Sequence, residues 1–551
     1  MSSFFQTHEA TLNLAMEAVR ARGHYTPYPE APSGRIYGET AKDDGAADFA
    51  AILNTTFPLD QPSAGDPVGA EASPYGFDLG ITYPAAPADM LVAAAKAAGR
   101  TLAAAAVDDR AGVCLEILSR LNAQSFLMAN AVMNTTGQAF IMAFQAGGPH
   151  AQDRGLEAVA TAYMAMSTVP GAVRWEKPMG KNPPAVMDKT FRITPRGVGL
   201  IIGCATFPTW NSYPALFANL ATGNASIVKP HPAAILPLAL TVKIARDVLA
   251  EAGLDPNAVI LAADTVERPV TMDFIGHDDV AMIDFTGSNA FGATVRAHAR
   301  GRPVFTEEAG VNPVVILGTP SFKGMCNNLA MSLSLYSGQM CTAPQSLFVP
   351  AEGIDTDEGH KSFDEVGEGI ARSLDKLLGD KDRAMAILGA IQNPATISRV
   401  EEAMKAGSVV RRSTPVEGAE KARTATPALI AVNASDEAWK EECFGPVAYL
   451  IRAEDAQAAI ALAEQSVREK GAITASVYAT DDALVDAAEE AFVRAGVALS
   501  VNLTGGILVN QSAAFSDFHV TGLNPAGTAS LTDLAFIAPR FGVTGVRKMA
   551  A

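Results

Sequence analysis

The sequence predicts an α/β fold with two domains, each built around a parallel β-sheet. Two stretches indicate this fold: residues 198–300 and residues 313–502 both alternate short apolar runs with longer segments of helical periodicity. Alternation of this kind is typical of right-handed βαβ units. The chain has 551 residues, which is too many for one small hydrophobic core. Two α/β domains are therefore expected.

Residues 1–85 are predicted to form an N-terminal extension. Residues 1–22 are expected to form a short amphipathic helix. Residues 23–85 are rich in Pro, Gly and Asp and are expected to lie extended over the main body. Apolar residues then recur at helical spacing, which predicts helices over Met90–Ala104 and Arg110–Thr136.

Residues 86–306 are expected to form a dinucleotide-binding domain. Ligands of parallel sheets bind at the carboxyl ends of strands, where Lys229, Gly287 and Ser288 fall. No GxGxxG motif follows the first strand, so glycine spacing alone names no cofactor. Strands are predicted over Val198–Gly203, Ala225–Lys229, Ala258–Ala263 and Val280–Phe285, and helices over Pro214–Thr222, Ile235–Gly253 and Ala290–Arg300.

Residues 307–502 are expected to form the second, catalytic domain, followed by a C-terminal loop and strand at 503–551. The predicted strands are Pro313–Leu317, Ser346–Val349 and Val477–Ala479, and the predicted helices are Asn327–Tyr336, Phe363–Leu378 and Asp455–Glu469. Near the C-terminus, Ala535–Arg540 and Val543–Lys548 are short enough to form an edge strand or an arm. An exposed terminal strand is a natural contact between subunits.

Composition excludes several classes of partner. The net charge of −17 would repel nucleic acid, and no run reaches the length of about 18 apolar residues that suggests a membrane span. The cysteines are few, odd in number and without a CxxC pair or a Cys/His cluster, so neither a metal site nor a disulfide framework is expected. A reducing cytoplasm is the expected location. The cysteines are Cys114, Cys204, Cys326, Cys341 and Cys443.

Cys341 and Glu307 are the candidate catalytic pair. Cys341 lies in the segment GQMCTA and Glu307 begins the segment EEAGVNP. A thiol is the better nucleophile of the two, and a carboxylate could activate the water that clears a covalent intermediate. Taken alone, each residue would more often be structural, because cysteine is commonly buried and a glutamate before a turn is usually solvated.

Four motifs in a fixed order strengthen this interpretation. Together they resemble the aldehyde dehydrogenase superfamily, over a region from about Ala95 to the C-terminus. A further segment, ATFPTWN at residues 205–211, suggests the subgroup of phenylacetate degradation that acts near aromatic ring cleavage. The four motifs are DFTGS at 284–288, EEAGVNP at 307–313, GQMC at 338–341 and EECFGPV at 441–447.

The resemblance implies NADP or NAD as cofactor. It assigns Lys229 to the adenosine ribose, and Glu442 and Phe444 to the nicotinamide ribose and ring. Pro232 stands where NAD-preferring members often have a ribose-binding glutamate. Without that carboxylate, a 2′-phosphate would meet less repulsion and could be attracted by Lys229 or His231. We therefore expect NADP to bind at least as well as NAD.

The resemblance also makes Glu307 the base, because it lies at the family's distance before Pro313. Glu308 is then expected to be a subgroup feature or a surface charge. At the position of the family's oxyanion-binding Asn, gapless counting places Thr206, while Asn211 follows five residues later. Thr206, Asn211 or backbone N–H groups alone could serve, with Thr206 preferred because it aligns without a gap. If Asn211 serves, Trp210 is expected to pack against the substrate.

The expected function is oxidation of an aldehyde to a carboxylic acid through a cysteine thioester. The subgroup resemblance points to a semialdehyde from aromatic ring cleavage, either free or linked to CoA. The alternatives are a CoA-acylating dehydrogenase, which Glu307 argues against, and a binding protein that keeps the fold without catalysis. The resemblance further implies a homo-oligomer, a dimer or a tetramer, with oligomerisation strands near residues 172–196.

Overall fold

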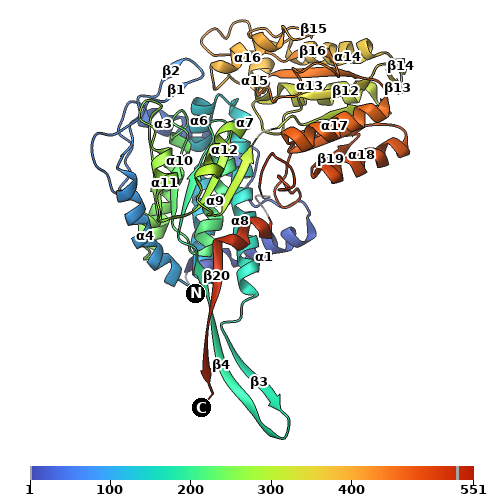
Figure 1. Ribbon diagram of the computed structural model, residues 1–551. Coiled ribbons are helices and arrows are strands. Elements are labelled where there is room, and N and C mark those ends of the chain that lie inside the picture. Colours follow the sequence, from blue (N-terminus) through green and yellow to red (C-terminus); the bar gives the residue numbers. More distant parts are fainter. Residues whose placement is uncertain (1–2, 309, 529–532, 551) are drawn as a thin grey trace.

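Two α/β domains and a projecting β-arm make up the molecule (Figure 1). The computed structural model describes residues 3–308, 310–528 and 533–550. In Figure 1 the first domain lies at the lower left, the second at the upper right, and the arm extends below the first. The predicted fold class, with a parallel sheet in each domain, is confirmed.

The first domain is built on a five-stranded sheet with the order β7-β6-β5-β8-β9, in which every pairing is parallel. Strands β5, β6 and β7 are buried along their whole length because helices cover both faces of the sheet. Because all pairings are parallel, the carboxyl ends of β6, β8 and β9, which carry Lys229, Gly287 and Glu307, lie along the same edge of the sheet. The strands are β5 (Val198–Ile202), β6 (Ser226–Lys229), β7 (Val259–Leu261), β8 (Val280–Gly287) and β9 (Val304–Glu308).

The helices of this domain are more numerous than predicted. The helix predicted over Arg110–Thr136 is two helices, because the chain breaks at Gln124, where φ is −103° and ψ is 21°. Helix α8 was not predicted; its turns are buried on nearly all sides and carry polar residues, so it has no clear apolar face. The helices are α4 (Ala88–Ala104), α5 (Val107–Ala123), α6 (Ser125–Thr136), α7 (Phe140–Gly147), α8 (Pro149–Ser167), α9 (Pro208–Thr222), α10 (Leu236–Glu251), α11 (Thr271–Gly276) and α12 (Asn289–His298).

The second domain contains a seven-stranded sheet with the order β15-β16-β17-β12-β10-β18-β19. Only the edge pair β15–β16 is antiparallel. The strands are β10 (Val314–Ile316), β12 (Ser346–Pro350), β15 (Ser408–Arg411), β16 (Ala428–Asn433), β17 (Val447–Ala453), β18 (Thr474–Tyr478) and β19 (Ala498–Val501). The helices are α13 (Phe322–Ser334), α14 (Phe363–Leu378), α15 (Lys381–Leu388), α16 (Ala395–Ala403), α17 (Ala456–Lys470) and α18 (Asp482–Ala495), and a small sheet joins β11 (Gly318–Thr319), β13 (Ile354–Thr356) and β14 (Gly359–Lys361).

The N-terminal extension is partly helical, which corrects the expectation of an extended segment. Its helices are α1 (Ser3–Ala21), α2 (Gly34–Tyr37) and α3 (Ala41–Ile52), and a short hairpin joins β1 (Ala72–Ser73) to β2 (Phe77–Asp78). The extension covers open backbone of the first domain. Gln61 exchanges two hydrogen bonds with the backbone of Leu261 on edge strand β7, at 2.8 and 2.9 Å. Glu71 accepts the backbone N–H groups of Ile235 and Leu236 at the start of α10.

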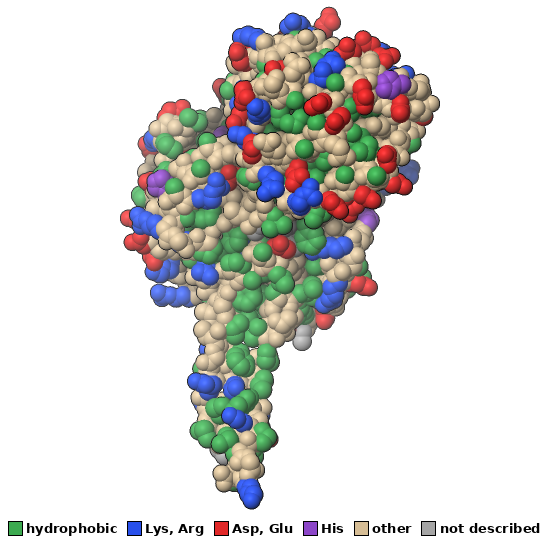
Figure 2. Space-filling view, turned by 45° about the vertical axis from the view of Figure 1, so that its right-hand side comes forward, with side chains coloured by type: hydrophobic (Ala, Val, Ile, Leu, Met, Phe, Trp, Pro, Cys, Tyr) green, Lys and Arg blue, Asp and Glu red, His purple; other side chains and the backbone are tan. Residues whose placement is uncertain are grey.

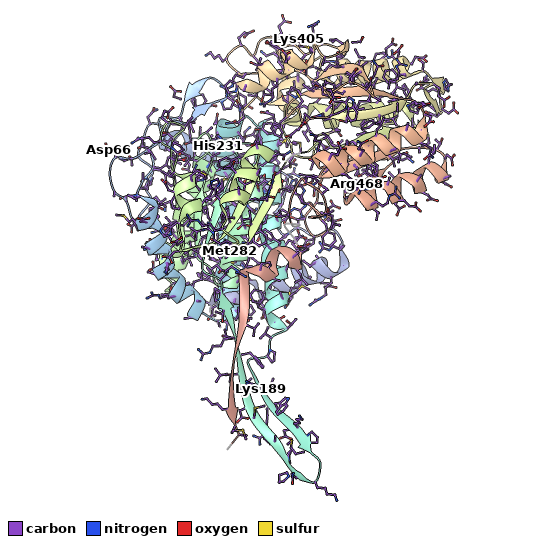
Figure 3. All side chains as sticks on the ribbon, viewed as in Figure 1. Asp66, Lys189, His231, Met282, Lys405 and Arg468 are labelled. Carbon is purple, nitrogen blue, oxygen red and sulfur yellow. The ribbon has the colours of Figure 1, made fainter. Side chains whose placement is uncertain are left out.

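The arm is a three-stranded antiparallel ribbon with the order β20-β4-β3. Its strands are β3 (Ala172–Met179), β4 (Asn182–Pro195) and β20 (Phe541–Met549), at the positions predicted for the oligomerisation and C-terminal strands. Residues 534–540 form helical turns (α19, Leu534–Ile537, and a short 3-10 turn) instead of a strand. Lys189 marks the arm in Figure 3, and apolar side chains gather along it in Figure 2. The exposed apolar residues of the arm include Val173, Met179, Val543, Val546 and Met549.

Arg540 anchors the arm to the first domain. Its guanidinium is fully buried and makes two hydrogen bonds to the Asp284 carboxylate on β8, at 2.5 and 3.0 Å. Such bidentate pairs fix geometry because both groups are planar. The acidic residue that opens the DFTGS motif thus fastens the C-terminal strand.

Within the described ranges, no single helix is both long and apolar enough to cross a membrane. Helices α4 and α5 are long and apolar enough for a membrane span only when taken together, and the chain bends by 118° between them.

Candidate active site

Cys341 lies in a loop that follows α13 and a short turn with unusual backbone. Tyr336, Ser337 and Gly338 all have φ between 50° and 63°, the left-handed region that costs free energy for a residue other than glycine. The surrounding structure enforces this path. Tyr336 donates to the Thr136 carbonyl at 2.5 Å, and Ser337 donates to the Leu388 carbonyl at 3.0 Å. The turn therefore presents Cys341 in a fixed position.

Asn312 clamps the loop from the other side. Its Nδ2 donates to the carbonyls of Cys341 and Ala343 at 2.8 and 3.0 Å. Its Oδ1 accepts the N–H groups of Ile473 and Thr474 at 2.9 and 3.2 Å. One buried amide thus ties the Cys341 loop to the start of β18.

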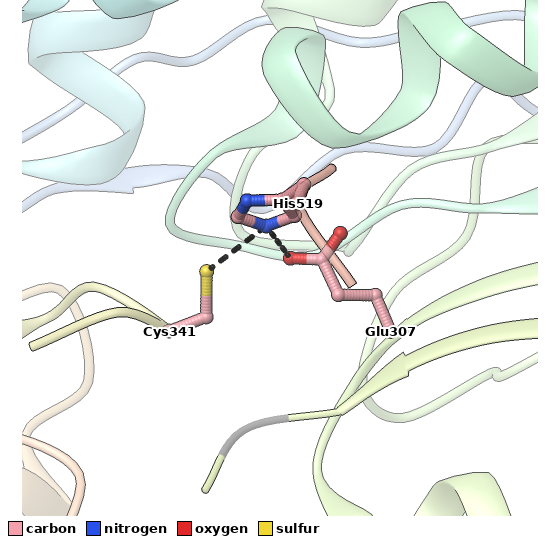
Figure 4. A group of neighbouring side chains, drawn as sticks. All are labelled: Glu307, Cys341 and His519. Carbon is pink, nitrogen blue, oxygen red and sulfur yellow. Dashed lines mark hydrogen bonds and ion pairs between the residues drawn. The ribbon is translucent and has the colours of Figure 1, made fainter. Parts of the chain in front are cut away.

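Glu307 reaches the same place from the end of β9. Its carboxylate is buried and accepts a hydrogen bond from Asn211 Nδ2 at 2.9 Å. The other carboxylate oxygen lies 3.1 Å from His519 Nε2, and the same ring nitrogen lies 3.9 Å from Cys341 Sγ (Figure 4). The structure therefore brings together the predicted nucleophile, the predicted base and Asn211, and adds a histidine.

The sequence argument missed His519. It is one of eight histidines, stands in a loop and belongs to none of the motifs, so no sequence signal distinguishes it. Glu307, Cys341 and His519 offer atoms within 4.8 Å of one another, a composition that can also hold a metal ion. The cluster was invisible in the sequence because its members are far apart along the chain. Covalent chemistry requires a free thiol, so we interpret the cluster as an acid–base group.

The charges in the cluster oppose one another. Burial acts to raise the pKa of Glu307, but His519 and hydrogen bonds from Cys341 and Asn211 outweigh it, so this pKa lies below its usual value. Burial and then the negative charge of Glu307 raise the pKa of the Cys341 thiol well above its usual value. The resting site accordingly holds a carboxylate beside a thiol.

Glu308 is not a surface charge, which corrects one of the two sequence expectations. Adjacent residues of a strand point to opposite faces, so Glu308 points away from Glu307 and toward α12. There it is buried and forms an ion pair with Arg296. A Cβ at Gly292 on α12 would lie 2.4 Å from the Glu308 carboxylate carbon, so glycine at this position makes room for that side chain.

The structure favours Asn211 over Thr206 as the donor near the reacting carbonyl. The Thr206 hydroxyl is directed toward Cys204 Sγ at 4.0 Å, whereas Asn211 lies in the first turn of α9 and lines a cavity with Cys341. The Cys204 thiol donates to Asn211 Oδ1 at 3.4 Å and so orients the amide. One amide hydrogen goes to Glu307, which leaves the other free for a ligand.

The cavity has a volume of about 400 Å³ and reaches Cys341. Its wall near the thiol is mostly apolar and includes Met142, Phe207, Trp210, Leu335 and Met340. Further residues come from the N-terminal extension and from α8: His24, Tyr25, Thr26, Glu30, His150 and Asp153. Trp210 therefore borders the space where a substrate would lie, as expected if Asn211 serves as donor.

The predicted cofactor residues lie at the carboxyl edge of the first sheet and on a facing loop. Lys229 ends β6, Gly287 ends β8, and Ser288 caps α12 by accepting the N–H of Phe291. His231 lies in the loop after β6 and accepts a hydrogen bond from Ala233 (Figure 3). These positions match the ligand edge expected for a parallel sheet.

Glu442 and Phe444 stand on a loop of the second domain. Gln345 holds this loop by donating to the Glu441 carbonyl at 2.9 Å and accepting from Cys443 N at 2.5 Å. Burial raises the pKa of Glu442 to about 7, against the opposing charge of Arg399. The same segment that carries Cys341 thus fixes the proposed nicotinamide-side residues.

Two features fit a dinucleotide. Asn289 Oδ1, at the start of α12, is buried and has no hydrogen-bond partner among the described residues, so a polar ligand group could satisfy it. The N-terminus of α12 also lies at the ligand edge, where helix termini favour phosphate.

Lys229 is less available than its sequence suggested. Its ammonium is buried and lies 2.6 Å from Asp264 Oδ1. The expectation that Lys229 attracts a 2′-phosphate did not include this carboxylate, which largely cancels the lysine charge. Asp264 follows β7 and carries no motif that would have indicated its position.

A thiol and an amide in one cavity, with a buried carboxylate in contact with the amide, are the groups that a cysteine-dependent oxidoreductase requires. A model of the aldehyde dehydrogenase family matches residues 82–516. The chain belongs to the aldehyde dehydrogenase family, and the predicted superfamily is confirmed.

Solved structures agree with this assignment. An NAD-dependent aldehyde dehydrogenase from Burkholderia multivorans is 51% identical, and the match covers 100% of both chains with a TM-score of 0.98. A 1-pyrroline-5-carboxylate dehydrogenase from Thermus thermophilus is 18% identical and covers 96% of this chain and 99% of its own, with a TM-score of 0.76; it supports the fold alone. An NADP-dependent glyceraldehyde-3-phosphate dehydrogenase from Bacillus halodurans also shares the fold. NAD and NADP both serve within this group.

Curated relatives are more distant. An N-succinylglutamate 5-semialdehyde dehydrogenase from Paraburkholderia xenovorans is 25% identical over 72% of this chain and 77% of its own length. A lactaldehyde dehydrogenase from Methanococcus maripaludis is 24% identical over 54% of this chain, and a vanillin dehydrogenase from Corynebacterium glutamicum is 29% identical over 52%. The chain spans just under 60% of the length of these last two relatives.

Replacing Glu307 and Glu308 tests which glutamate is the base. Glu307→Gln should slow thioester hydrolysis by about 100-fold or more while hydride transfer continues, because a general base typically contributes that much. Stopped-flow absorbance should show a burst of reduced nicotinamide followed by a slow steady state. Glu308→Gln breaks an ion pair outside the cavity and should produce no burst. The reverse ranking would show that Glu308 is the base.

Replacing Asn211 and Thr206 tests the oxyanion donor. Asn211→Ala should lower the pre-steady-state rate of adduct formation by about 100- to 1000-fold, the usual cost of one such donor. Thr206→Val keeps its shape and should change the rate little, because the hydroxyl faces Cys204. A large loss of rate in Thr206→Val with an unchanged rate in Asn211→Ala would make Thr206 the donor, as the gapless alignment suggested. An unchanged rate in both variants would leave the backbone N–H groups as the donors.

Proposed function

We propose that the protein oxidises an aldehyde to its carboxylic acid, with NAD or NADP as acceptor. The observation that carries this proposal is that Asn211 and Cys341 line one cavity and that the buried Glu307 carboxylate contacts Asn211 and His519 of the cavity wall. A nucleophile and a water-activating base at one carbonyl are the two requirements for making and hydrolysing a thioester. A binding protein that had lost catalysis would have no need to preserve this arrangement.

Each residue has a defined task. Cys341 Sγ adds to the aldehyde carbon, and the free Asn211 N–H and backbone N–H groups bind the developing oxyanion. Glu442, Phe444, Lys229 and the α12 terminus would hold the nicotinamide cofactor, which when bound supplies the acceptor for the hydride. Glu307 then takes a proton from the water that attacks the Cys341 thioester.

Hydrolysis is favoured over transfer to CoA. The Glu307 carboxylate lies buried behind the cavity residues Asn211 and His519 with a lowered pKa, so it is ionised and able to activate water at neutral pH. A CoA-acylating enzyme needs no such base. CoA-dependent acylation is therefore the second candidate, supported only by the subgroup resemblance.

A direct assay tests the function and the nucleophile together. Purified protein with an aldehyde and NAD or NADP should produce reduced nicotinamide, and the rate should not depend on CoA. Cys341→Ser should abolish turnover, because a hydroxyl is a far weaker nucleophile than a thiolate, while cofactor binding by fluorescence persists. Cys326→Ala, a buried cysteine of the second domain, is the matched control and should retain turnover. Full activity in Cys341→Ser would refute the covalent mechanism.

For the substrate we propose a semialdehyde from aromatic ring cleavage of the phenylacetate type, free or CoA-linked. The segment at residues 205–211 supports this, and an apolar cavity with polar groups farther from the thiol suits a carbon chain that ends in a polar group. Asp153 is the notable polar group of that region. It is about 94% buried, and its Oδ1 has no partner among the described residues.

Asp153 is expected to recognise a hydrogen-bond donor at the far end of the substrate. Asp153→Leu should lower kcat/KM by about fivefold for aldehydes with a distal hydroxyl or amide N–H, the usual worth of one hydrogen bond. Simple alkyl aldehydes should be unaffected, and Asp153→Asn, which keeps an acceptor, should resemble the native protein. The ratio of the kcat/KM values for the two substrate classes does not depend on how much protein is folded. An equal loss of kcat/KM for both classes would therefore exclude this role.

NAD is the proposed preferred cofactor. By the family resemblance Lys229 contacts the adenosine ribose, and Asp264 beside it would repel a 2′-phosphate while accepting hydrogen bonds from ribose hydroxyls. Asp264→Asn should therefore shift the ratio of NADP to NAD efficiency toward NADP by about tenfold, or about 1.4 kcal/mol. Asp247→Asn, an exposed change on α10, is the control. A native preference for NADP would contradict this assignment.

We further propose a homo-oligomer, a dimer or a tetramer, that works in the cytoplasm. The exposed apolar side chains along the arm support association, because such residues are commonly covered by another subunit. Light scattering of the intact chain measures the oligomer size.

A further inference from the structure

His519 joins three parts of the active site. Its Nε2 lies 3.1 Å from Glu307 Oε1 and 3.9 Å from Cys341 Sγ, so one ring nitrogen stands within reach of both reacting groups (Figure 4). The ring packs edge-on against Trp210 at 4.6 Å between centroids, and its other nitrogen lies 3.0 Å from Ser512 Oγ. The side chain is 3% exposed, so its position is set by these contacts.

The cluster presents an electrostatic problem. Ionising Cys341 would place a thiolate beside the buried Glu307 carboxylate, and two like charges this close are costly in a low dielectric. Yet the reaction needs the thiolate as nucleophile and the carboxylate as base. A cation between them would remove the conflict, and His519 is the described group that lies there.

We propose that His519 is a catalytic base for Cys341. The Sγ–H bond breaks as the proton moves to Nε2, and the resulting imidazolium remains between the thiolate and Glu307. The electron pair on sulfur then attacks the aldehyde carbon. When water cleaves the thioester, the proton returns from Nε2 to Sγ, while Glu307 passes the proton it takes from water to solvent. The role during turnover rests on the proposed function; the proton transfer itself does not.

The surroundings of the ring suit this role. Ser512 Oγ can accept a hydrogen bond from Nδ1–H, and in that tautomer Nε2 carries a lone pair that can take the thiol proton. The Nε2–H formed in this way can donate to Glu307 Oε1, which lies 3.1 Å away. Arg154 on α8 donates to the same Ser512 oxygen at 2.8 Å, and its own charge is offset by Glu157 at 3.0 Å. The other titratable groups here are Glu307, Cys341 and Cys204. Among the described residues, the Glu307 carboxylate is the charged group in direct contact with the ring.

His519 follows the family match, which ends at residue 516, and lines the cavity that reaches Cys341.

Alkylation of Cys341 tests the proposal without aldehyde or cofactor. Native protein and His519→Gln are treated with iodoacetamide across a pH series, and modification of Cys341 is followed by mass spectrometry of its peptide. The midpoint of the pH profile should move upward in His519→Gln, and the rate at neutral pH should fall about tenfold for each unit of that movement. Because thiolate formation is read directly, a purely structural role of His519 predicts an unchanged midpoint.

Two further variants complete the test. Ser512→Ala keeps the imidazole but removes its Nδ1 partner, and it should shift the midpoint in the same direction by a smaller amount. His360→Gln, an exposed histidine in the second domain, should behave like native protein. An unchanged profile in His519→Gln overturns the proposal, and if that variant does not fold, an unchanged profile in Ser512→Ala does so. If the pH profile of alkylation shifts in His519→Gln but the native protein oxidises no aldehyde, the role of His519 as a base stands and the proposed function is refuted.

Discussion

The Asn312 amide is the interaction on which the geometry of the site depends. It satisfies two carbonyls of the Cys341 loop and two N–H groups at the start of β18, so one side chain fixes the nucleophile relative to the sheet of the second domain. These backbone groups are buried, so they could not form hydrogen bonds with water if the amide were lost. Gly310, in the same motif, lies close to the backbone of Gly471. A Cβ at Gly310 would lie 2.1 Å from the Gly471 carbonyl oxygen. The motif EEAGVNP therefore combines the proposed base with the clamp that positions the proposed nucleophile.

The pleat of β9 separates two adjacent glutamates that look equivalent in the sequence. Glu307 and Glu308 are both buried, but one faces the cavity and the other faces α12, where Arg296 neutralises it. Burying two adjacent carboxylates is tolerable only because each has its own partners. The same strand can in this way supply both a reactive carboxylate and a structural one.

The N-terminal extension has a structural and a functional side. It covers the edge of the first sheet through Gln61 and supplies Glu71 to the exposed N–H groups at the start of α10. Burial raises the pKa of Glu71 to about 7, although hydrogen bonds from Tyr83, Leu236 and Ile235 oppose the rise. His24, Tyr25, Thr26 and Glu30 line the cavity that reaches Cys341, from a segment that precedes the family match.

The sequence by itself determined the two α/β domains, the strands at the arm and the catalytic pair Cys341 and Glu307 as candidates. These features depend on local periodicity and on contiguous motifs, which are visible in the sequence alone. Only the tertiary structure decided the rest. It split the helix over 110–136, turned part of residues 23–85 into helix α3, and placed Asn211 instead of Thr206 beside the thiol. It also paired Lys229 with Asp264 and brought His519 to Cys341. The physical reason is that burial, charge pairing and side-chain direction are set by partners that lie far away along the chain.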